Sequence, residues 1–169
     1  MASRYTRDIP LPGMDAEGGY RGPQVAKIVG ISYRQLDHWT STGLVVPSVR
    51  DADGSGSQRL YGFDDILQLK VIKRLRDAGV SLQRIRRAID EVRDRGLSLR
   101  DLMLASDSAG NVIAVDDQQQ AMDLLMSGQG VFFIAIDPVA EEVLRDVAAL
   151  EPERAVPAVV RPLHGRRVI

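Results

Sequence analysis

The 169-residue chain contains no cysteine and only two histidines, His38 and His164. Without cysteine it can form no disulfide and offers no thiolate to a soft metal or a redox signal. It also lacks a run of about 18 apolar residues, which a membrane-spanning helix needs, and no apolar segment follows its charged start. We therefore expect a cytoplasmic protein with no metal centre, no cofactor and no membrane partner.

Catalytic patterns are lacking as well. No nucleophile stands beside a general base, and no group of side chains has the spacing of metal ligands. The Gly54-Ser55-Gly56 stretch is not followed by Gly-Lys-Ser or Gly-Lys-Thr, so it does not match a phosphate-binding loop. The sequence predicts a protein that is not an enzyme.

Charge is distributed unevenly along the chain, although the net charge is only −1. Residues 20–96 contain 14 basic and 9 acidic side chains, whereas residues 97–169 contain 6 basic and 11 acidic ones. A positive excess suits a segment that approaches phosphates, and the acidic half is then expected to face away from DNA. The same imbalance also arises by chance in a chain of two domains, so it does not decide the function alone.

Residues 22–41 have the spacing of a helix-turn-helix. Pro23 stands in the first turn of a predicted helix, where its missing N–H costs nothing, and Gly30 stands at a sharp turn. Ser32 follows in the position that caps a second helix.

The second predicted helix, residues 32–41, is amphipathic. Leu36 and Trp39 fall on one side at helical spacing and are expected in the core. The other faces, one of which would enter the major groove of DNA, carry Tyr33, Arg34, Asp37 and His38.

The chain then predicts a hairpin and two more helices. Residues 46–61 form two short extended arms around a Gly/Ser-rich tip, which is typical of a two-stranded wing. A helix is expected over residues 63–77, and Ser81 caps another whose apolar residues recur at helical spacing.

The order of these parts resembles the winged-helix DNA-binding domain of the MerR family of bacterial transcription regulators, over about residues 20–93. The residues that carry the resemblance are Val25-Ala26, Gly30-Ile31-Ser32, Arg34, Leu36, Trp39, Gly43-Leu44, Pro47, Arg59-Leu60-Tyr61, Asp65, Ala78-Gly79-Val80-Ser81-Leu82 and Ile85. The resemblance implies a DNA-binding regulator that distorts promoter DNA to change polymerase access.

Three positions depart from the family pattern. Asp37 stands where relatives commonly have a basic residue, and a carboxylate there repels a phosphate; it either pairs with Arg34 or accepts a hydrogen bond from cytosine N4. Gly22-Pro23 and Gly62 replace the usual residues before the first and third helices. The long dimerisation helix found in much of the family is also absent or shortened, because Gly96 interrupts the chain where it would begin.

Arg34 is the leading candidate for a DNA contact, because its guanidinium can bind O6 and N7 of guanine together, worth about 1–3 kcal/mol of discrimination. Ser32 either contacts a phosphate or serves only as a helix cap. Arg50 and Arg59 lie at the bases of opposite wing arms and either reach phosphates or are ordinary surface arginines. By resemblance, Tyr61 adds a hydroxyl donor. The full candidate set is Ser32, Tyr33, Arg34, His38, Arg50, Arg59 and Tyr61.

The pattern changes after residue 101. Residues 102–105 and 112–115 predict a hairpin, a helix follows Asp116 or Asp117, residues 131–136 form an apolar strand, and Asp137-Pro138 opens a last helix. This order is ββαβα, in a unit so small that it is near the limit of independent stability.

We expect this unit to pair with a second copy, because a strand apolar on both faces needs cover on both. The strand, or the apolar face of the last helix, would then supply the homodimer interface. The candidate interface residues are Val131, Phe132, Phe133, Ile134 and Leu144.

The sequence therefore predicts an α+β chain in four parts. These are a flexible arm (residues 1–19), a winged helix-turn-helix domain (20–96), a small C-terminal ββαβα dimerisation or effector domain (97–151) and a flexible tail (152–169). The predicted function is a homodimeric, nucleoid-associated transcription regulator that binds near-palindromic sites in double-stranded promoter DNA, and RNA polymerase is a further candidate partner. The alternatives are a winged-helix interaction module that binds a partner in the transcription machinery, and a regulator that responds to a small molecule.

Overall fold

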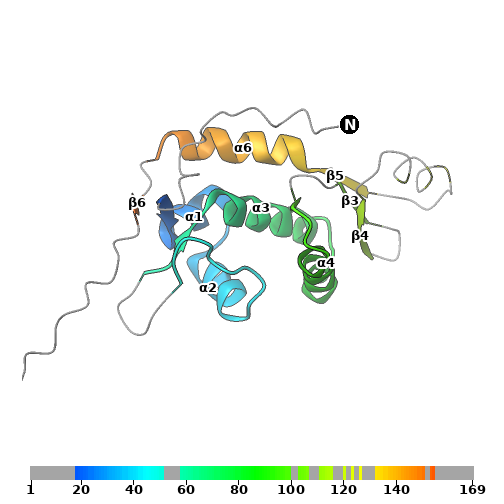
Figure 1. The fold of residues 1–169 in the computed structure, drawn as a ribbon, viewed down its shortest axis with the longest axis horizontal. Coiled ribbons are helices and arrows are strands. Elements are labelled where there is room, and N and C mark those ends of the chain that lie inside the picture. The colour runs from blue at the N-terminus through cyan, green and yellow to red at the C-terminus, as the bar shows by residue number, and fades with distance from the viewer. Residues whose placement is uncertain are drawn as a thin grey trace, which may run out of the picture.

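The computed structural model describes residues 18–51, 58–99, 103–106, 111–115, 132–150 and 153–154, with the single positions 120, 123 and 126. Five helices with described bounds and two small sheets surround one hydrophobic core (Figure 1). No helix in this described part is long and apolar enough to cross a membrane.

The helix-turn-helix is formed by α1 (Gly22–Val29) and α2 (Tyr33–Ser41), as the sequence predicts. Gly30 ends α1 in the left-handed region at φ 77°, a conformation that glycine adopts without strain. Ser32 caps α2: its Oγ accepts from Gln35 N at 3.1 Å, and Gln35 Oε1 accepts from Ser32 N at 3.0 Å. These caps fix the turn between the two helices.

A three-stranded sheet lies beside these helices, in the order β2-β1-β6, with antiparallel pairing throughout. Its strands are β1 (Gly18–Arg21), β2 (Leu60–Tyr61) and β6 (Glu153–Arg154). Arg50 and Leu60 exchange backbone hydrogen bonds of 3.2 and 2.8 Å, which gives the two arms of the predicted wing a paired base. The tip of the wing lies outside the described residues.

The strand β1 corrects the predicted boundaries at both ends of the chain. Gly18 and Gly19 belong to a buried strand and not to a flexible arm, and β6 pairs with them from within the predicted tail. A side chain at position 19 would place its Cβ 2.9 Å from the Leu60 Cβ, so the glycine permits close packing of the two strands. The glycine pair that suggests a linker therefore serves the sheet.

Two further helices complete the N-terminal unit. They are α3 (Phe63–Asp77), over the predicted range, and α4 (Leu82–Asp94), which follows its predicted cap: Ser81 Oγ accepts from the backbone N–H of Arg84. Most of α3 is buried, and α1 and α4 both pack against it. The helix α3 is therefore the central helix of this unit.

The C-terminal part contains the second sheet, in the antiparallel order β4-β3-β5. Its strands are β3 (Met103–Ser106), β4 (Val112–Val115) and β5 (Phe132–Ala135). The predicted hairpin and the predicted apolar strand are therefore present as strands. The helix expected after Asp116 or Asp117 lies mostly outside the described residues, as does Val131, and the side chains of Phe132, Phe133 and Ile134 are not described.

The last helix, α6 (Ile136–Ala148), packs along α3 of the same chain (Figure 1). Val139, Val143 and Val147 are each 0% exposed and belong to the same core cluster as the helix-turn-helix, and Leu144 is partly buried against that cluster. The expectation that this apolar face meets a second copy is therefore wrong. The apolar face of α6 is already buried within the same chain, because it packs against apolar side chains of α3.

Candidate nucleic-acid interface

The exposed face of α2 is the centre of the candidate interface. Tyr33 is 58% exposed, and Arg34 and His38 are also exposed, whereas Leu36 and Trp39 are buried as predicted. Within the described part of the chain, Arg34 makes no hydrogen bond or ion pair, so its guanidinium is available to a ligand. The Tyr33 ring lies against the backbone of Gly22, where an added Cβ would stand 2.7 Å from the ring Cε2. The structure thus brings Tyr33, Arg34 and His38 together on one helix.

Ser32 acts as the cap of this helix. Besides accepting from Gln35 N, its hydroxyl donates to Gln35 Oε1 at 3.1 Å. Of the two predicted roles, the structure places Ser32 in the capping one, and a phosphate contact would have to compete with these bonds.

Arg59 is held in an ion-pair cluster that the sequence does not predict. Its Nη1 donates to Asp37 Oδ1 at 2.5 Å, and its Nε donates to Asp51 Oδ1 at 3.3 Å. Asp37 therefore pairs with the wing and not with Arg34. The hydrogen bond to Asp37 raises the pKa of the Arg59 guanidinium. Asp37, which appears unfavourable for DNA binding in the sequence alone, has a definite partner in the fold.

Tyr61 lies in the core and not at the surface. It is 2% exposed, and its hydroxyl shares a 2.9 Å hydrogen bond with Thr40 Oγ1, which is also buried. Burial raises the pKa of the Tyr61 phenol. The expectation that its hydroxyl contacts DNA is not met, because the side chain instead connects β2 to α2.

Arg50 and Asp65 hold the base of the wing. Arg50 Nε donates to the carbonyl oxygen of Gln58 at 2.9 Å. Asp65 Oδ2 accepts from Ser48 N, Ser48 Oγ and Gly62 N at 2.7 to 2.8 Å. Burial raises the pKa of the Asp65 carboxyl despite these hydrogen bonds, which act in the opposite direction. This buried carboxylate fixes the start of the wing against α3.

Arg86 has a role that the sequence does not indicate. It lies on α4, and its guanidinium donates to the carbonyl oxygen of Thr42 at 2.9 Å and to Thr42 Oγ1 at 3.0 Å. Because carbonyl groups at a helix C-terminus lack intrahelical donors, Arg86 stabilises the end of α2. The sequence gives no signal for this contact, because Arg86 and Thr42 are 44 residues apart.

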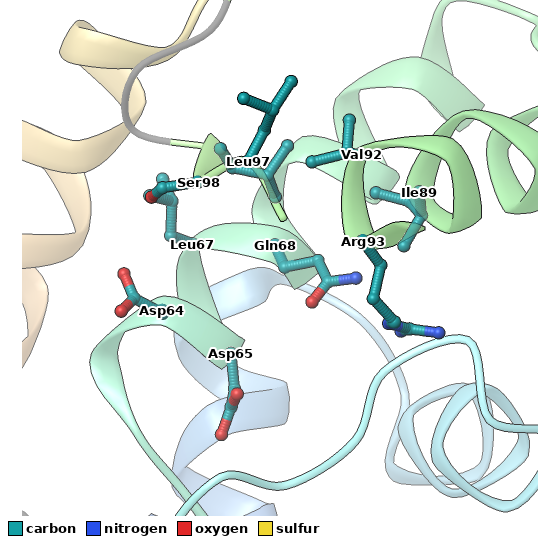
Figure 2. A pocket seen from close by; sticks show the side chains of 10 residues that line it. Asp64, Asp65, Leu67, Gln68, Ile89, Val92, Arg93, Leu97 and Ser98 are labelled. Carbon is teal, nitrogen blue, oxygen red and sulfur yellow. The ribbon is translucent and has the colours of Figure 1, made fainter. Parts of the chain in front are cut away.

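A cavity of about 230 Å³ lies between α3, α4 and the segment after α4. Asp64, Asp65 and Gln68 line it from α3, Arg93 faces them from α4, and Leu97 and Ser98 border it (Figure 2). Its volume is below the roughly 300–1,000 Å³ of typical small-molecule sites. Among the described residues, no group of three or more His, Cys, Asp or Glu could hold a metal ion.

Comparison with known proteins agrees with the geometry of the N-terminal unit. The model of the MerR HTH family regulatory proteins matches residues 20–92. An uncharacterized HTH-type transcriptional regulator of Mycobacterium tuberculosis (strain ATCC 25618 / H37Rv) is 51% identical over 138 residues, which are 81% of this chain and 61% of the relative.

Two rhizobial relatives match over a shorter range. The HTH-type transcriptional regulator HmrR of Sinorhizobium medicae (strain WSM419) is 33% identical over 47% of this chain and 52% of the relative. Heavy metal-dependent transcription regulator 1 of Rhizobium meliloti (strain 1021) is 36% identical over 43% of this chain and 48% of the relative. The chain thus spans about three fifths of the length of the mycobacterial relative and about half that of the rhizobial ones. The capped α1–α2 unit, the wing base and the family match together establish that residues 20–92 are a helix-turn-helix domain of the MerR family.

Proposed function

We propose that this protein is a sequence-specific DNA-binding transcription regulator whose helix α2 reads base edges in the major groove. The observation that carries the proposal is the exposed face of α2, where Arg34 has no partner among the described residues and Tyr33 and His38 flank it. A guanidinium free of intramolecular bonds can bind a guanine edge without first losing a contact. The names of the relatives as transcriptional regulators support this function.

We further propose that the protein binds near-palindromic sites as a homodimer, because two recognition helices on one symmetric site are the common arrangement for such domains. The valine face of α6 is unavailable for this purpose, since α3 covers it. The strand β5 is a better candidate: it lies at one edge of the sheet β4-β3-β5 in the described part of the chain. An edge strand has backbone groups that a second copy can pair with.

The test is a selection of bound fragments from a random duplex library by the purified full chain. Variant Arg34→Ala is run in parallel, and Arg145→Ala is the matched control, because it removes the same charge from an exposed position on α6. We expect the wild type and the control to recover one inverted repeat at 0.15 M salt. Arg34→Ala should bind that repeat about 5- to 150-fold more weakly, the equivalent of one bidentate base contact.

Two results would contradict the proposal. One is recovery of fragments with no shared motif, with binding that disappears as salt rises, since this indicates phosphate attraction alone. The other is an Arg34→Ala variant that binds the selected repeat as tightly as Arg145→Ala does.

A further inference from the structure

Arg59 lies between two carboxylates that come from different parts of the candidate interface. Asp37 belongs to α2, 22 residues away in sequence, and Asp51 belongs to the opposite arm of the wing, 8 residues away. The exposed fractions of the three side chains are 24% for Arg59, 53% for Asp37 and 62% for Asp51. The cluster therefore joins the recognition helix to the wing while it remains accessible from outside.

The charge of this cluster is unusual for a surface that meets DNA. One guanidinium faces two carboxylates, so the cluster carries an excess of negative charge. Asp37 lies three residues after Arg34 on α2, a separation that places two side chains on neighbouring positions of a helix surface. A phosphate that approaches Arg34 thus also meets a carboxylate, and Arg59, the wing cation that contacts this carboxylate, is already paired.

We propose that Asp37 determines DNA specificity, because its carboxylate engages Arg59 and repels phosphates and so weakens the binding of random duplex while the base contacts of α2 are kept. This inference rests on the proposed function, since it requires DNA to bind at α2. Attraction between phosphates and cations supplies nearly all of non-specific affinity, whereas base-edge contacts carry the sequence information. A residue that withholds one cation from every phosphate therefore improves the ratio between target and random DNA.

The experiment compares wild type with Asp37→Asn, which removes the charge but keeps the size of the side chain. Each full-length protein is titrated with the selected repeat and with a random duplex of equal length, over a series of salt concentrations. Asp90→Asn is the matched control, because it removes a carboxylate that is paired with Arg93 on α4 and changes the net charge equally. A fourth protein, Asp37→Asn with Arg59→Gln, tests whether the effect acts through Arg59.

We expect Asp37→Asn to bind random duplex about two- to fivefold more tightly at 0.1 M salt, the range that an exposed ion pair is worth. For random duplex, the slope of log affinity against log salt concentration should become more negative by about 0.9, which corresponds to one additional phosphate contact. The ratio of target to random affinity should fall, Asp90→Asn should keep the wild-type ratio, and adding Arg59→Gln should return the salt slope to the wild-type value.

The inference is overturned if Asp37→Asn weakens both duplexes equally, because Asp37 then only supports the fold. It is also overturned if the ratio and the salt slope stay at the wild-type values. In both cases the proposed function stands, since the wild type still selects its repeat. If the wild type binds neither duplex, both proposals fail.

Discussion

The contact between α6 and α3 depends on a buried lysine, and removal of its partners should destabilise the whole fold. The side chain of Lys70 is 6% exposed, and its Nζ donates to Glu142 Oε1 and Asp146 Oδ2, each at 2.6 Å. The two carboxylates are 37% and 40% exposed, so they keep part of their hydration, whereas the ammonium does not. The lysine is therefore the member of this cluster that cannot lose its partners without cost.

The expected loss in the free energy of unfolding follows from this difference in exposure between Lys70 and its two carboxylate partners. Breaking a buried ion pair by removal of one partner costs about 3–5 kcal/mol, and we take the lower end for Glu142→Gln with Asp146→Asn, about 3 kcal/mol, because the amide oxygens still accept hydrogen bonds. Asp146→Asn alone leaves Glu142 in place and should cost about 1 kcal/mol. Adding Lys70→Met to the double variant removes the unpaired charge and should recover most of the loss.

Urea unfolding of the full chain, followed by circular dichroism, measures these differences. Asp77→Asn is the control, because Asp77 pairs with Lys73 on the exposed side of α3, and such a pair is worth about 0.5 kcal/mol or less. If the double variant unfolds within 0.5 kcal/mol of the wild type, or if Lys70→Met adds a further loss, the ammonium is not held as the structure indicates.

Three further predictions concern the same core and its surroundings. Val143→Ala, at a position 0% exposed, should lower the free energy of unfolding by about 2 kcal/mol, and in sedimentation experiments the variant should self-associate as the wild type does, because the valine lies in the core beside α3 and not in a dimer interface. Tyr61→Phe should cost about 1–2 kcal/mol through the lost bond to Thr40, yet bind the selected repeat as tightly as wild type, and a tenfold loss of affinity would restore Tyr61 as a DNA contact. The hydrogen bond from Lys70 lowers the pKa of Glu142 in the folded protein. The ionised Glu142 therefore stabilises the fold fully above the ordinary glutamate pKa, and this contribution is lost as the pH falls through the lowered pKa of the folded state. Unfolding midpoints should therefore drop more steeply below about pH 4 for wild type than for Glu142→Gln.

The helices could be predicted from the sequence because their signals are local. Ser32, Ser81 and Gly30 stand at the ends of the helices as caps and turns, and helical spacing of apolar residues fills the intervals. Such signals depend only on residues a few positions apart. The exposure of Arg34 and the burial of Trp39 follow from the same periodicity.

The features that could not be predicted from the sequence depend on contacts between segments that are distant in the chain. The strand β2 is two residues long and both are buried, so no alternation shows that Tyr61 points inward. The glycines of β1 suggest a linker until the close approach to Leu60 is seen. One feature of the sequence could have predicted that α6 packs on α3. The helix α3 carries apolar residues around much of its surface, with Lys70 among them. A helix of that kind is covered by other elements on more than one side. A buried lysine there also calls for a carboxylate partner from another element.

The positive charge excess of residues 20–96 is partly neutralised in the fold, so it attracts DNA phosphates less than the residue count suggests. Lys70 and Arg74 of α3 are paired with the carboxylates of α6, and in Figure 1 α6 and α2 lie on opposite sides of α3. The acidic segment thus neutralises cations that could not reach DNA bound at α2, and it does so far from the recognition helix. At the interface itself, Arg59 is held by two carboxylates, so the total charge overstates the attraction for phosphates. With Arg59 held in this way, we expect discrimination among DNA sequences to depend more on direct base contacts, such as the one proposed for Arg34, than on the overall electrostatic field.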